Sequence, residues 1–427
     1  MLIHSAAQLL TLAGGIQRGK HLGDLGLIPN GAVLIRGEKI VCTGSTPELL
    51  AAYPNESLFD ASGKVVMPGF VDPHTHLIFM GNRALEFEMR LEGKTYLEIM
   101  NAGGGIVNTV KATRQACLNE LKQAARFRMD GMLRHGTTTA EAKSGYGLEY
   151  NSEIIQLKAI LELNNEHPMD LVPTFLGAHA IPVEFQNNTD GYTQEIVNHM
   201  LPGLLAWWQV NNPGNPLPFV DVFCETGAFS LEQSRSILET ALQLGFLIKI
   251  HADEFDNLGG TSLAAALGAV SADHVVKTSA KDIAALAHSN TVAVALPPTP
   301  FGLAQSEYTP AKQILEAGGI LAIASDLNPG TAWCESMQFV IALACRYLKI
   351  TSAQAIAAAT INAAAAINRA ETIGSLEPGK QADLLILSSG DYRNLGYRFG
   401  TNQVERVLKS GQWVVVNEPY RSEYANT

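Results

Sequence analysis

The sequence lacks the features that mark secreted, membrane-spanning or nucleic-acid-binding proteins. Its five cysteines are scattered over 427 residues without a Cys-x-x-Cys pair, which predicts reduced thiols in a cytoplasmic protein and no disulfide framework. No apolar run reaches the roughly 18 residues that a membrane span needs, and the N-terminus has no basic start of a signal peptide. The formal net charge is −11, so we expect neither nucleic acid nor an anionic membrane as a partner.

What the chain does have is length and apolar content. With 427 residues and a hydrophobic fraction of 47%, it exceeds one ordinary domain and can bury a large core. Strand-like segments are expected at residues 65–74, 137–142, 170–177, 219–224, 245–251, 270–275, 291–296 and 320–325. Helical patterns lie between them, as at 152–163, 230–244 and 259–267. Strands that alternate with helices over roughly 250 residues predict a (β/α)8 TIM barrel, with an open doubly wound sheet as the alternative.

Both ends of the chain carry further strand material. Residues 31–41 have the pattern of a hairpin, and residues 382–387 and 403–416 have the pattern of strands. Neither end can bury a core alone, so we expect them to form one small β-sandwich domain beside the barrel. The predicted division assigns 1–64 and 369–427 to this domain and 65–368 to the barrel. The alanine-rich residues 352–367 predict one helix.

The apolar run at 65–71 leads to His74 and His76. Residues i and i+2 of a strand share one face, so both imidazoles can reach one metal ion. Alone, this pair is more often two unrelated histidines. The expected strands downstream also end in polar residues, namely His251, His274 and Asp326, with Glu254 three residues after His251.

Each of these strand-end residues alone is more often a hydrogen-bonded group at the edge of a core. Together, His74, His76, His251 and Asp326 make a mixed nitrogen and oxygen site at the same end of three strands, which suits Zn²⁺ or iron. A cation at such a site lowers the pKa of water to about 7. Asp326 can take the proton of that water, which leaves Glu254 and His274 for acid–base work and substrate contacts.

The run Pro68-Gly69-Phe70-Val71-Asp72-Pro73-His74-Thr75-His76, the later strand-end residues and the tail at 374–384 resemble the amidohydrolase superfamily. Further segments resemble one family within it, the imidazolonepropionases, over nearly the whole chain. They are Gly81-Asn82-Arg83, Ala102-Gly103-Gly104-Gly105-Ile106, Lys143-Ser144-Gly145-Tyr146-Gly147, Leu176-Gly177-Ala178-His179 and Asp326-Leu327-Asn328-Pro329-Gly330-Thr331.

The resemblance implies hydrolysis of the cyclic amide of 4-imidazolone-5-propanoate to N-formimidoyl-L-glutamate, a step of histidine degradation. It implies one Zn²⁺ or iron ion per chain, held by His74, His76, His251 and Asp326. It also implies substrate contacts from Arg83, Tyr146, His179, Glu254, Asn328, Gly330 and Thr331, and catalytic roles for His274, Glu254 and Asp326. An arginine fork suits the propanoate tail of a small anionic substrate, although Arg83 could equally form a surface ion pair.

The roles of four other features stay open on the sequence alone. Glu225 could orient a metal histidine, and Lys143 could in principle bridge metals as a carbamate, which its place on the second strand disfavours. Residues 102–105 are glycine-rich but wrongly placed for a phosphate loop. Residues 295–303, Ala-Leu-Pro-Pro-Thr-Pro-Phe-Gly-Leu, depart from the family pattern and could reshape one wall of the pocket.

Two other functions compete with this interpretation. A heterocycle deaminase would use the same residues His251, Glu254, His274 and Asp326, and ammonia release would identify it. A non-catalytic interaction protein on the same scaffold is disfavoured because all four metal positions are filled. We also expect a homodimer, which is common for this architecture.

Overall fold

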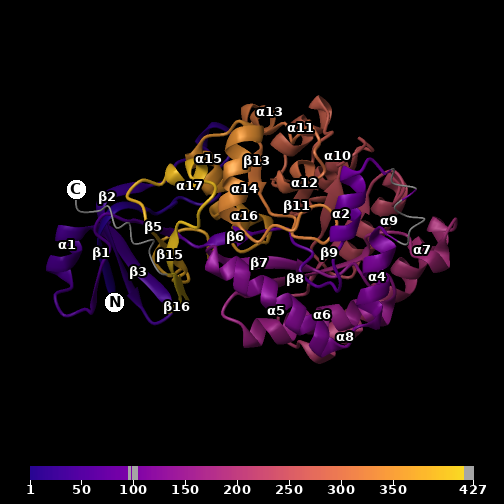
Figure 1. Ribbon diagram of the computed structural model, residues 1–427, viewed down its shortest axis with the longest axis horizontal. Coiled ribbons are helices and arrows are strands. Elements are labelled where there is room, and N and C mark those ends of the chain that lie inside the picture. Colours follow the sequence, from indigo (N-terminus) through magenta and orange to yellow (C-terminus); the bar gives the residue numbers. More distant parts are fainter. Residues whose placement is uncertain (95–97, 99–103, 418–427) are drawn as a thin grey trace.

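The computed structural model describes residues 1–94, 98 and 104–417, and a parallel barrel forms its centre (Figure 1). The barrel strands follow one another in chain order, each hydrogen-bonded to the next. They are β6 (Phe70–Asp72), β7 (Thr137–Lys143), β8 (Asp170–Ala178), β9 (Phe219–Cys224), β10 (Lys249–Ala252), β11 (Ser271–His274), β12 (Val292–Ala295) and β13 (Ile320–Ile323). The predicted (β/α)8 barrel is therefore confirmed.

The barrel closes just beyond the carboxyl ends of its first and last strands. Thr75 and Leu327 form a parallel bridge. The N–H of Asp326 donates to the carbonyl of His74 at 3.1 Å, and the N–H of His76 donates to the carbonyl of Leu327 at 2.9 Å. Closure thus brings the two segments that carry predicted metal ligands side by side.

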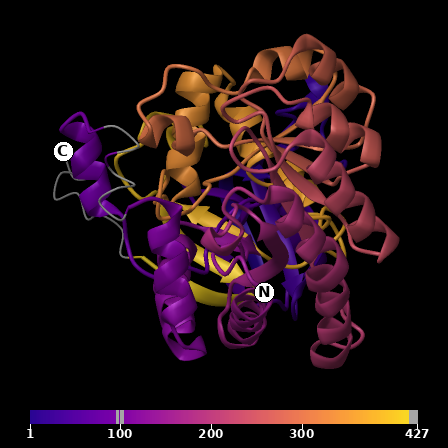
Figure 2. The same ribbon diagram turned by 90° about the vertical axis from the view of Figure 1, so that its right-hand side faces the viewer.

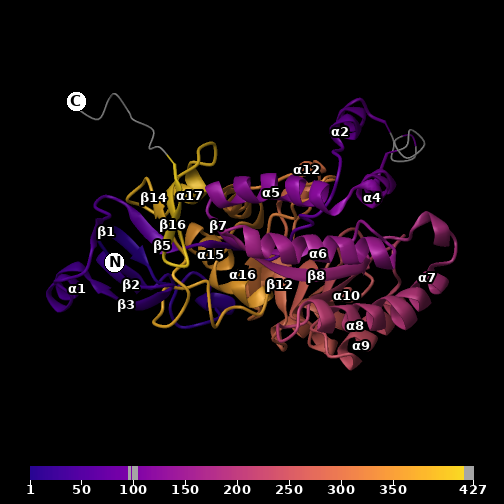
Figure 3. The ribbon, with the colours of Figure 1, turned by 90° about the horizontal axis from the view of Figure 1, so that it is seen from below.

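Helices surround the strands (Figure 2). They are α2 (Ala84–Leu91), α4 (Ile106–Gln115), α5 (Leu118–Arg134), α6 (Tyr150–Glu166), α7 (Thr189–Glu195), α8 (Leu201–Asn211), α9 (Leu231–Gln243), α10 (Gly260–Leu267), α11 (Ala280–Ala287), α12 (Pro298–Gly302), α13 (Ala311–Glu316), α14 (Met337–Leu343), α15 (Ser352–Ala358) and α16 (Ile361–Ala366). Figure 3 shows α2 at the margin of the molecule, far from the small sheet. No helix in the described ranges is long and apolar enough to cross a membrane.

Strands from both chain ends form the second sheet, as predicted (Figure 1). They are β1 (Leu2–Leu10), β2 (Leu27–Arg36), β3 (Lys39–Ser45), β4 (Leu58–Asp60), β5 (Val65–Pro68), β14 (Leu384–Leu387), β15 (Val404–Lys409) and β16 (Gln412–Val416). The short helix α1 (Thr46–Ala52) packs on this sheet, whereas α17 (Asn394–Tyr397), between β14 and β15, packs on α14. The predicted hairpin is β2 and β3, with its turn at Gly37.

The expected single strand at 65–74 is wrong. Its first half is β5, which pairs with β1 and β14 in the small sheet, whereas β6 pairs with β7 in the barrel. Gly69 joins the two, and its N–H donates to the carbonyl of Asp383 at 3.0 Å. A Cβ on Gly69 would lie 2.3 Å from the Thr138 hydroxyl, so only glycine lets the chain pass between the two sheets here.

The expected single helix at 352–367 is also wrong, because it is broken between α15 and α16. The carbonyl of Ala359 accepts the N–H of Val71 from the barrel, and the Thr360 hydroxyl donates to the carbonyl of Ile356 at 2.7 Å. These tertiary and side-chain bonds replace the helical ladder at the break. The seven remaining barrel-strand predictions overlap β7 to β13.

Candidate active site

The four predicted metal ligands converge at the carboxyl ends of the barrel strands. His74 and His76 follow β6, His251 lies in β10, and Asp326 follows β13. The Nε2 atom of His76 lies 3.3 Å from the Nε2 atoms of both His74 and His251. One Asp326 oxygen, Oδ1, lies 3.4 Å from His74 Nε2 and 3.5 Å from His76 Nε2.

These distances fit a divalent cation. Nitrogen and oxygen ligands at about 2.0–2.1 Å in a tetrahedron lie about 3.4 Å apart, which is the spacing found here. Burial holds the pKa values of His74 and His76 well below their usual range, so both imidazoles are neutral, as metal binding requires. The donor set and its spacing support a metal cofactor and leave zinc and iron as the options.

Buried carboxylates orient two of the histidines. His74 Nδ1 donates to Asp273 Oδ2 at 2.6 Å, and His251 Nδ1 lies 3.0 Å from Asp221 Oδ2. Such partners fix the ring orientation and the tautomer of a metal-binding histidine. Glu225 does not do this, because its carboxylate accepts the backbone N–H groups of residues 226, 255 and 256. It fixes the backbone that follows Glu254.

Two fully buried lysines neutralise these carboxylates. Lys143 Nζ lies 2.7 Å from Asp221 and 2.9 Å from Glu141, and Lys249 Nζ lies 2.9 Å from Glu141. Burial alone would lower the pKa of Lys143, but Asp221, Glu141 and Asp273 raise it above its usual value. A charged ammonium does not form a carbamate, which argues against Lys143 as a metal-bridging group.

The sequence reasoning missed Asp221, Asp273, Glu141 and Lys249. All four lie in barrel strands and are fully buried. Their signal was a charged residue within a segment expected to be a barrel strand, since isolated buried charges are expensive and need partners.

His274 and Glu254 lie beside the histidine cluster. The His274 ring centre is 5.3 Å from that of His251 and 5.4 Å from that of His74, and its Nε2 lies 3.6 Å from Glu254 Oε2. Burial, with Asp326 and Glu225 nearby, raises the pKa of Glu254 well above its usual range. Burial lowers the pKa of His274. Burial therefore favours the uncharged form of both groups.

A cavity of 570 Å³ opens beside the cluster, and the structure brings all of the predicted substrate-contact residues to its wall. They are Arg83, Tyr146, His179, Glu254, Asn328, Gly330 and Thr331. The His179 ring stacks on that of His76 at 4.7 Å, and its Nδ1 donates to the carbonyl of Gly145 at 2.9 Å. Burial raises the pKa of Tyr146, so its hydroxyl keeps its proton.

Arg83 and Asn328 also have partners within the protein. Arg83 Nε donates to Glu86 at 2.7 Å, and Glu86 also accepts the N–H of Gly105 at 2.9 Å. The Oδ1 atom of Asn328 accepts the N–H groups of Gly330 and Thr331, so these groups close the turn after β13. Ala102 and Gly103 of the glycine-rich segment lie outside the described residues.

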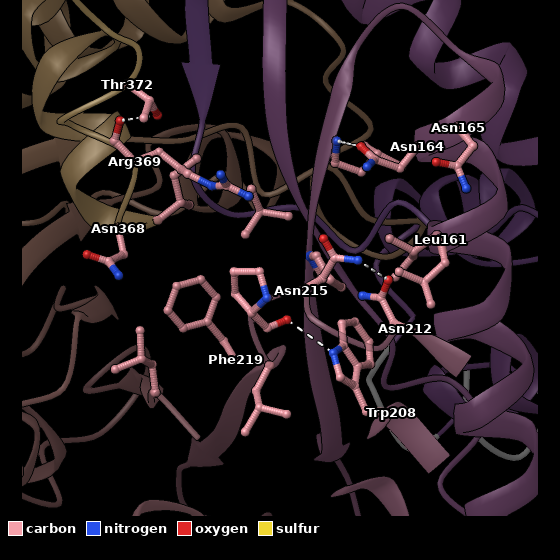
Figure 4. A pocket seen from close by; sticks show the side chains of 18 of the residues that line it. Leu161, Asn164, Asn165, Trp208, Asn212, Asn215, Phe219, Asn368, Arg369 and Thr372 are labelled. Carbon is pink, nitrogen blue, oxygen red and sulfur yellow. Dashed lines mark hydrogen bonds between the residues drawn. The ribbon is translucent and has the colours of Figure 1, made fainter. Parts of the chain in front are cut away.

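A second cavity, of 370 Å³, lies at the opposite ends of the strands (Figure 4). Asparagines of α6 and α8 line it, together with Phe219 at the start of β9 and Arg369. None of the predicted site residues lines it. The convergent donors therefore lie only at the carboxyl-end face among the described residues, where barrel enzymes carry their active sites.

A closed parallel barrel with imidazole and carboxylate donors at these strand ends defines a metal-dependent amidohydrolase. The amidohydrolase family matches residues 225–414 and, in a second match, residues 57–115. The chain belongs to the imidazolonepropionase family and is a hydrolase, because it is 50% identical to the imidazolonepropionase of Herpetosiphon aurantiacus over 98% of this chain and 97% of that protein. It is 47% identical to the imidazolonepropionase of Chloroflexus aggregans over 98% and 99% of the two chains.

Solved structures share the fold at low identity. Guanine deaminase of E. coli has a TM-score of 0.72 at 15% identity, covering 98% of this chain and 99% of that one. An adenosine deaminase from Xanthomonas campestris with bound zinc has a TM-score of 0.69 at 19% identity, covering 97% and 92%. These likenesses concern the fold alone and do not outweigh the family membership, so they do not favour the deaminase alternative.

Proposed function

We propose that the chain hydrolyses the cyclic amide of 4-imidazolone-5-propanoate to N-formimidoyl-L-glutamate in histidine degradation. One observation carries this proposal: the wall of a single 570 Å³ cavity contains both Arg83 and members of the histidine and aspartate cluster that could hold a metal ion. The cluster suits the activation of water for attack on an amide, and the arginine suits the carboxylate tail of the substrate.

In this proposal His74, His76, His251 and Asp326 hold one zinc or iron ion per chain. The ion, when bound, supplies a Lewis acid and lowers the pKa of water to about 7. Asp273 and Asp221 keep His74 and His251 in the tautomer that presents Nε2 to the ion. The support is the 3.3–3.5 Å spacing of the donor atoms.

The substrate is held at both ends. Glu86 accepts a hydrogen bond from Arg83 Nε. This bond orients the guanidinium and leaves its terminal nitrogens for the propanoate group. Tyr146 donates its hydroxyl proton to a substrate oxygen, and His179 contacts the ring from the stacked position over His76. Thr331 and Gly330 form the wall behind the tail, in the turn closed by Asn328.

The reaction adds the oxygen of water to the ring carbonyl carbon and then breaks the carbon–nitrogen bond of the amide. Asp326 takes a proton from the attacking water and passes it to the departing nitrogen. His274 donates an N–H to the oxyanion on the former carbonyl oxygen, and Glu254, whose carboxyl group lies 3.6 Å from His274, contacts the ring nitrogen that remains. Water is consumed and no ammonia is released.

The direct test follows the absorbance of freshly prepared 4-imidazolone-5-propanoate with and without a chelator. We expect metal-dependent loss of the imidazolone signal, with N-formimidoyl-L-glutamate as the product and no ammonia. Ammonia release from a heterocycle would instead establish the deaminase. A metal-loaded protein that leaves the imidazolone intact would refute the proposal.

We further propose the domain division 1–64, 65–368 and 369–427, a cytoplasmic location and a homodimer. The five cysteines are all unpaired, which supports a reducing compartment. The proposed partner is the small anionic substrate, with no nucleic acid or membrane partner. Sedimentation equilibrium of the metal-loaded protein tests the dimer, since a constant monomer mass at micromolar concentration would exclude it.

A further inference from the structure

The unusual segment 295–303 does not line the substrate cavity, yet it contacts the predicted metal site from behind. None of its residues belongs to the wall of the 570 Å³ cavity. Its first residue, Ala295, ends β12, and α12 then runs from Pro298 to Gly302. The buried Thr299 hydroxyl donates to Asp326 Oδ2, the carboxylate oxygen that is not directed at His74 and His76.

Thr299 is held in a rigid setting. Pro298 and Pro300 flank it, and a proline ring fixes its own φ near −65°. Its backbone N–H donates to the carbonyl of Leu296 at 3.1 Å, and its carbonyl accepts the N–H of Leu303 at 3.0 Å. The hydroxyl therefore reaches Asp326 from a fixed backbone and with few alternative directions.

The end of the same helix packs closely against the turn that follows Asp326. A Cβ on Gly302 would lie 1.9 Å from the carbonyl oxygen of Thr331, so only glycine permits this approach. The helix thus contacts both ends of the 326–331 turn, through Thr299 at its start and Gly302 at its finish.

We infer that α12 is a positioning element, in which Thr299 sets the orientation of the Asp326 carboxylate and Gly302 sets the position of the Thr331 turn. With Oδ2 held by Thr299, only Oδ1 faces the histidine nitrogens at 3.4–3.5 Å. If the Asp326 carboxylate rotated freely, either oxygen could face the histidines. A misplaced catalytic group lowers the rate of the reaction. This inference rests on the proposed function of the metal site.

The test compares Thr299→Val, which removes the hydroxyl at nearly constant volume, with Thr299→Ser, which keeps it. A hydrogen bond to a charged group is worth enough to predict a loss in kcat of about tenfold to hundredfold for T299V, with KM changed less than about threefold. T299S is expected to keep most of the wild-type kcat. Thr291→Val is the matched control, because the buried Thr291 hydroxyl has no hydrogen-bond partner among the described residues.

A second readout does not depend on turnover. In cobalt(II)-substituted protein, T299V should change the visible absorption spectrum of the metal and weaken cobalt retention in a chelator competition, while T299S and T291V should match the wild type. If T299V does not fold, the pair Thr299→Ala and Thr299→Ser isolates the hydroxyl in the same way. Wild-type kcat together with a wild-type cobalt spectrum in the variant without the hydroxyl would overturn the role of Thr299.

Gly302→Ala tests the second contact. We expect a rise in KM of about fivefold or more with a smaller change in kcat. The added Cβ should displace Thr331, at the far end of the 326–331 turn, and leave the metal ligands in place. An unchanged KM would remove Gly302 from the inference. An inactive wild type would refute the proposed function. An active wild type whose Thr299 variants keep its kcat and its cobalt spectrum would refute only the inference.

Discussion

At the scale of single residues, most of the site depends on which partner takes the second polar atom of each side chain. Glu86 occupies one nitrogen of Arg83, and Asp273 occupies the second nitrogen of His74. These contacts leave Arg83 at the wall of the cavity and leave Nε2 of His74 facing His76 and Asp326. The chemistry therefore depends on buried acids as much as on the groups that face the substrate.

Arg83→Lys should raise KM for the imidazolone substrate by about tenfold or more, because an ammonium cannot form the two-pronged pair with a carboxylate. The kcat value should change less, since the guanidinium contacts the tail and not the reacting carbon. Steady-state kinetics check this, with the exposed Arg235→Lys on α9 as the control. An unchanged KM in R83K would place the propanoate group elsewhere in the cavity.

His274→Ala should lose kcat by about a hundredfold or more while the protein keeps its metal, because general acid–base and oxyanion groups contribute at this level. Elemental analysis of the purified variant separates the two effects. His288→Ala, an exposed residue, is the control. Loss of the metal with the activity would make His274 a structural member of the cluster, and full turnover would remove it from the mechanism.

The proposed metal ligands can be predicted from the sequence, whereas the residues that support them were not. His74, His76, His251 and Asp326 end apolar runs, and that pattern is visible without a structure. The bond from Thr299 to Asp326 joins two segments 27 residues apart, and its signal is hidden in a proline-rich run. The folded barrel, and not the sequence, shows which oxygen of Asp326 accepts the hydrogen bond from the Thr299 hydroxyl.

At the scale of elements, the secondary structure differs at two places from what the local sequence pattern predicts, and tertiary contacts are the cause. The run at 65–71 reads as one strand, yet the Gly69 contact with Thr138 divides it between two sheets. The alanine-rich run at 352–367 reads as one helix, yet the barrel takes the carbonyl of Ala359. In both cases a long-range partner overrode an intrinsic preference, which sequence patterns do not contain.

The loop that carries Tyr146 is held by one buried acid on α6. Glu153 accepts the N–H groups of Gly145, Gly147 and Leu148 at 2.7–2.9 Å. Burial raises the pKa of Glu153 above its usual value, although hydrogen bonds from Ser144 and the backbone oppose the rise. The folded state therefore holds this proton more tightly than the unfolded chain does.

It follows that the free energy of unfolding of the wild type should fall relative to that of Glu153→Gln as pH rises from about 4.3, the unfolded value, through the raised pKa. Above that pKa the difference should be constant. Urea unfolding of both proteins between pH 4 and 8 measures it, and parallel curves over the whole range would contradict it. The variant should also show a raised KM, since the Tyr146 loop loses an acceptor.

At the scale of the whole molecule, the metal site joins parts of the chain that are far apart in sequence. Its predicted ligands follow or lie in β6, β10 and β13, and β6 continues directly from β5 of the small sheet. Lys409 of that sheet adds a second link, because its Nζ lies 2.6 Å from Asp170 at the start of β8. A change at the metal cluster is therefore expected to affect the stability of both sheets together.

Removal of the metal should lower the unfolding temperature. An ion that binds only the folded chain adds about 4 kcal/mol when its free concentration is a thousandfold above its Kd, so a chelator should shift the transition by several degrees. Calorimetry with and without chelator measures the shift, and elemental analysis confirms the release. His76→Ala, which lacks one of the four donors, should respond to chelator much less than the wild type.

Re-addition of one ion at a time then separates zinc from iron, since the ion that the site prefers restores the higher transition at the lower concentration. Because only Gly69 separates β5 of the small sheet from β6 of the barrel, we expect both sheets to unfold in one transition. A wild type that releases its metal with no change in the transition would show that the four donors hold their positions without the ion, and that the buried network of Lys143, Lys249 and their carboxylates alone maintains the site.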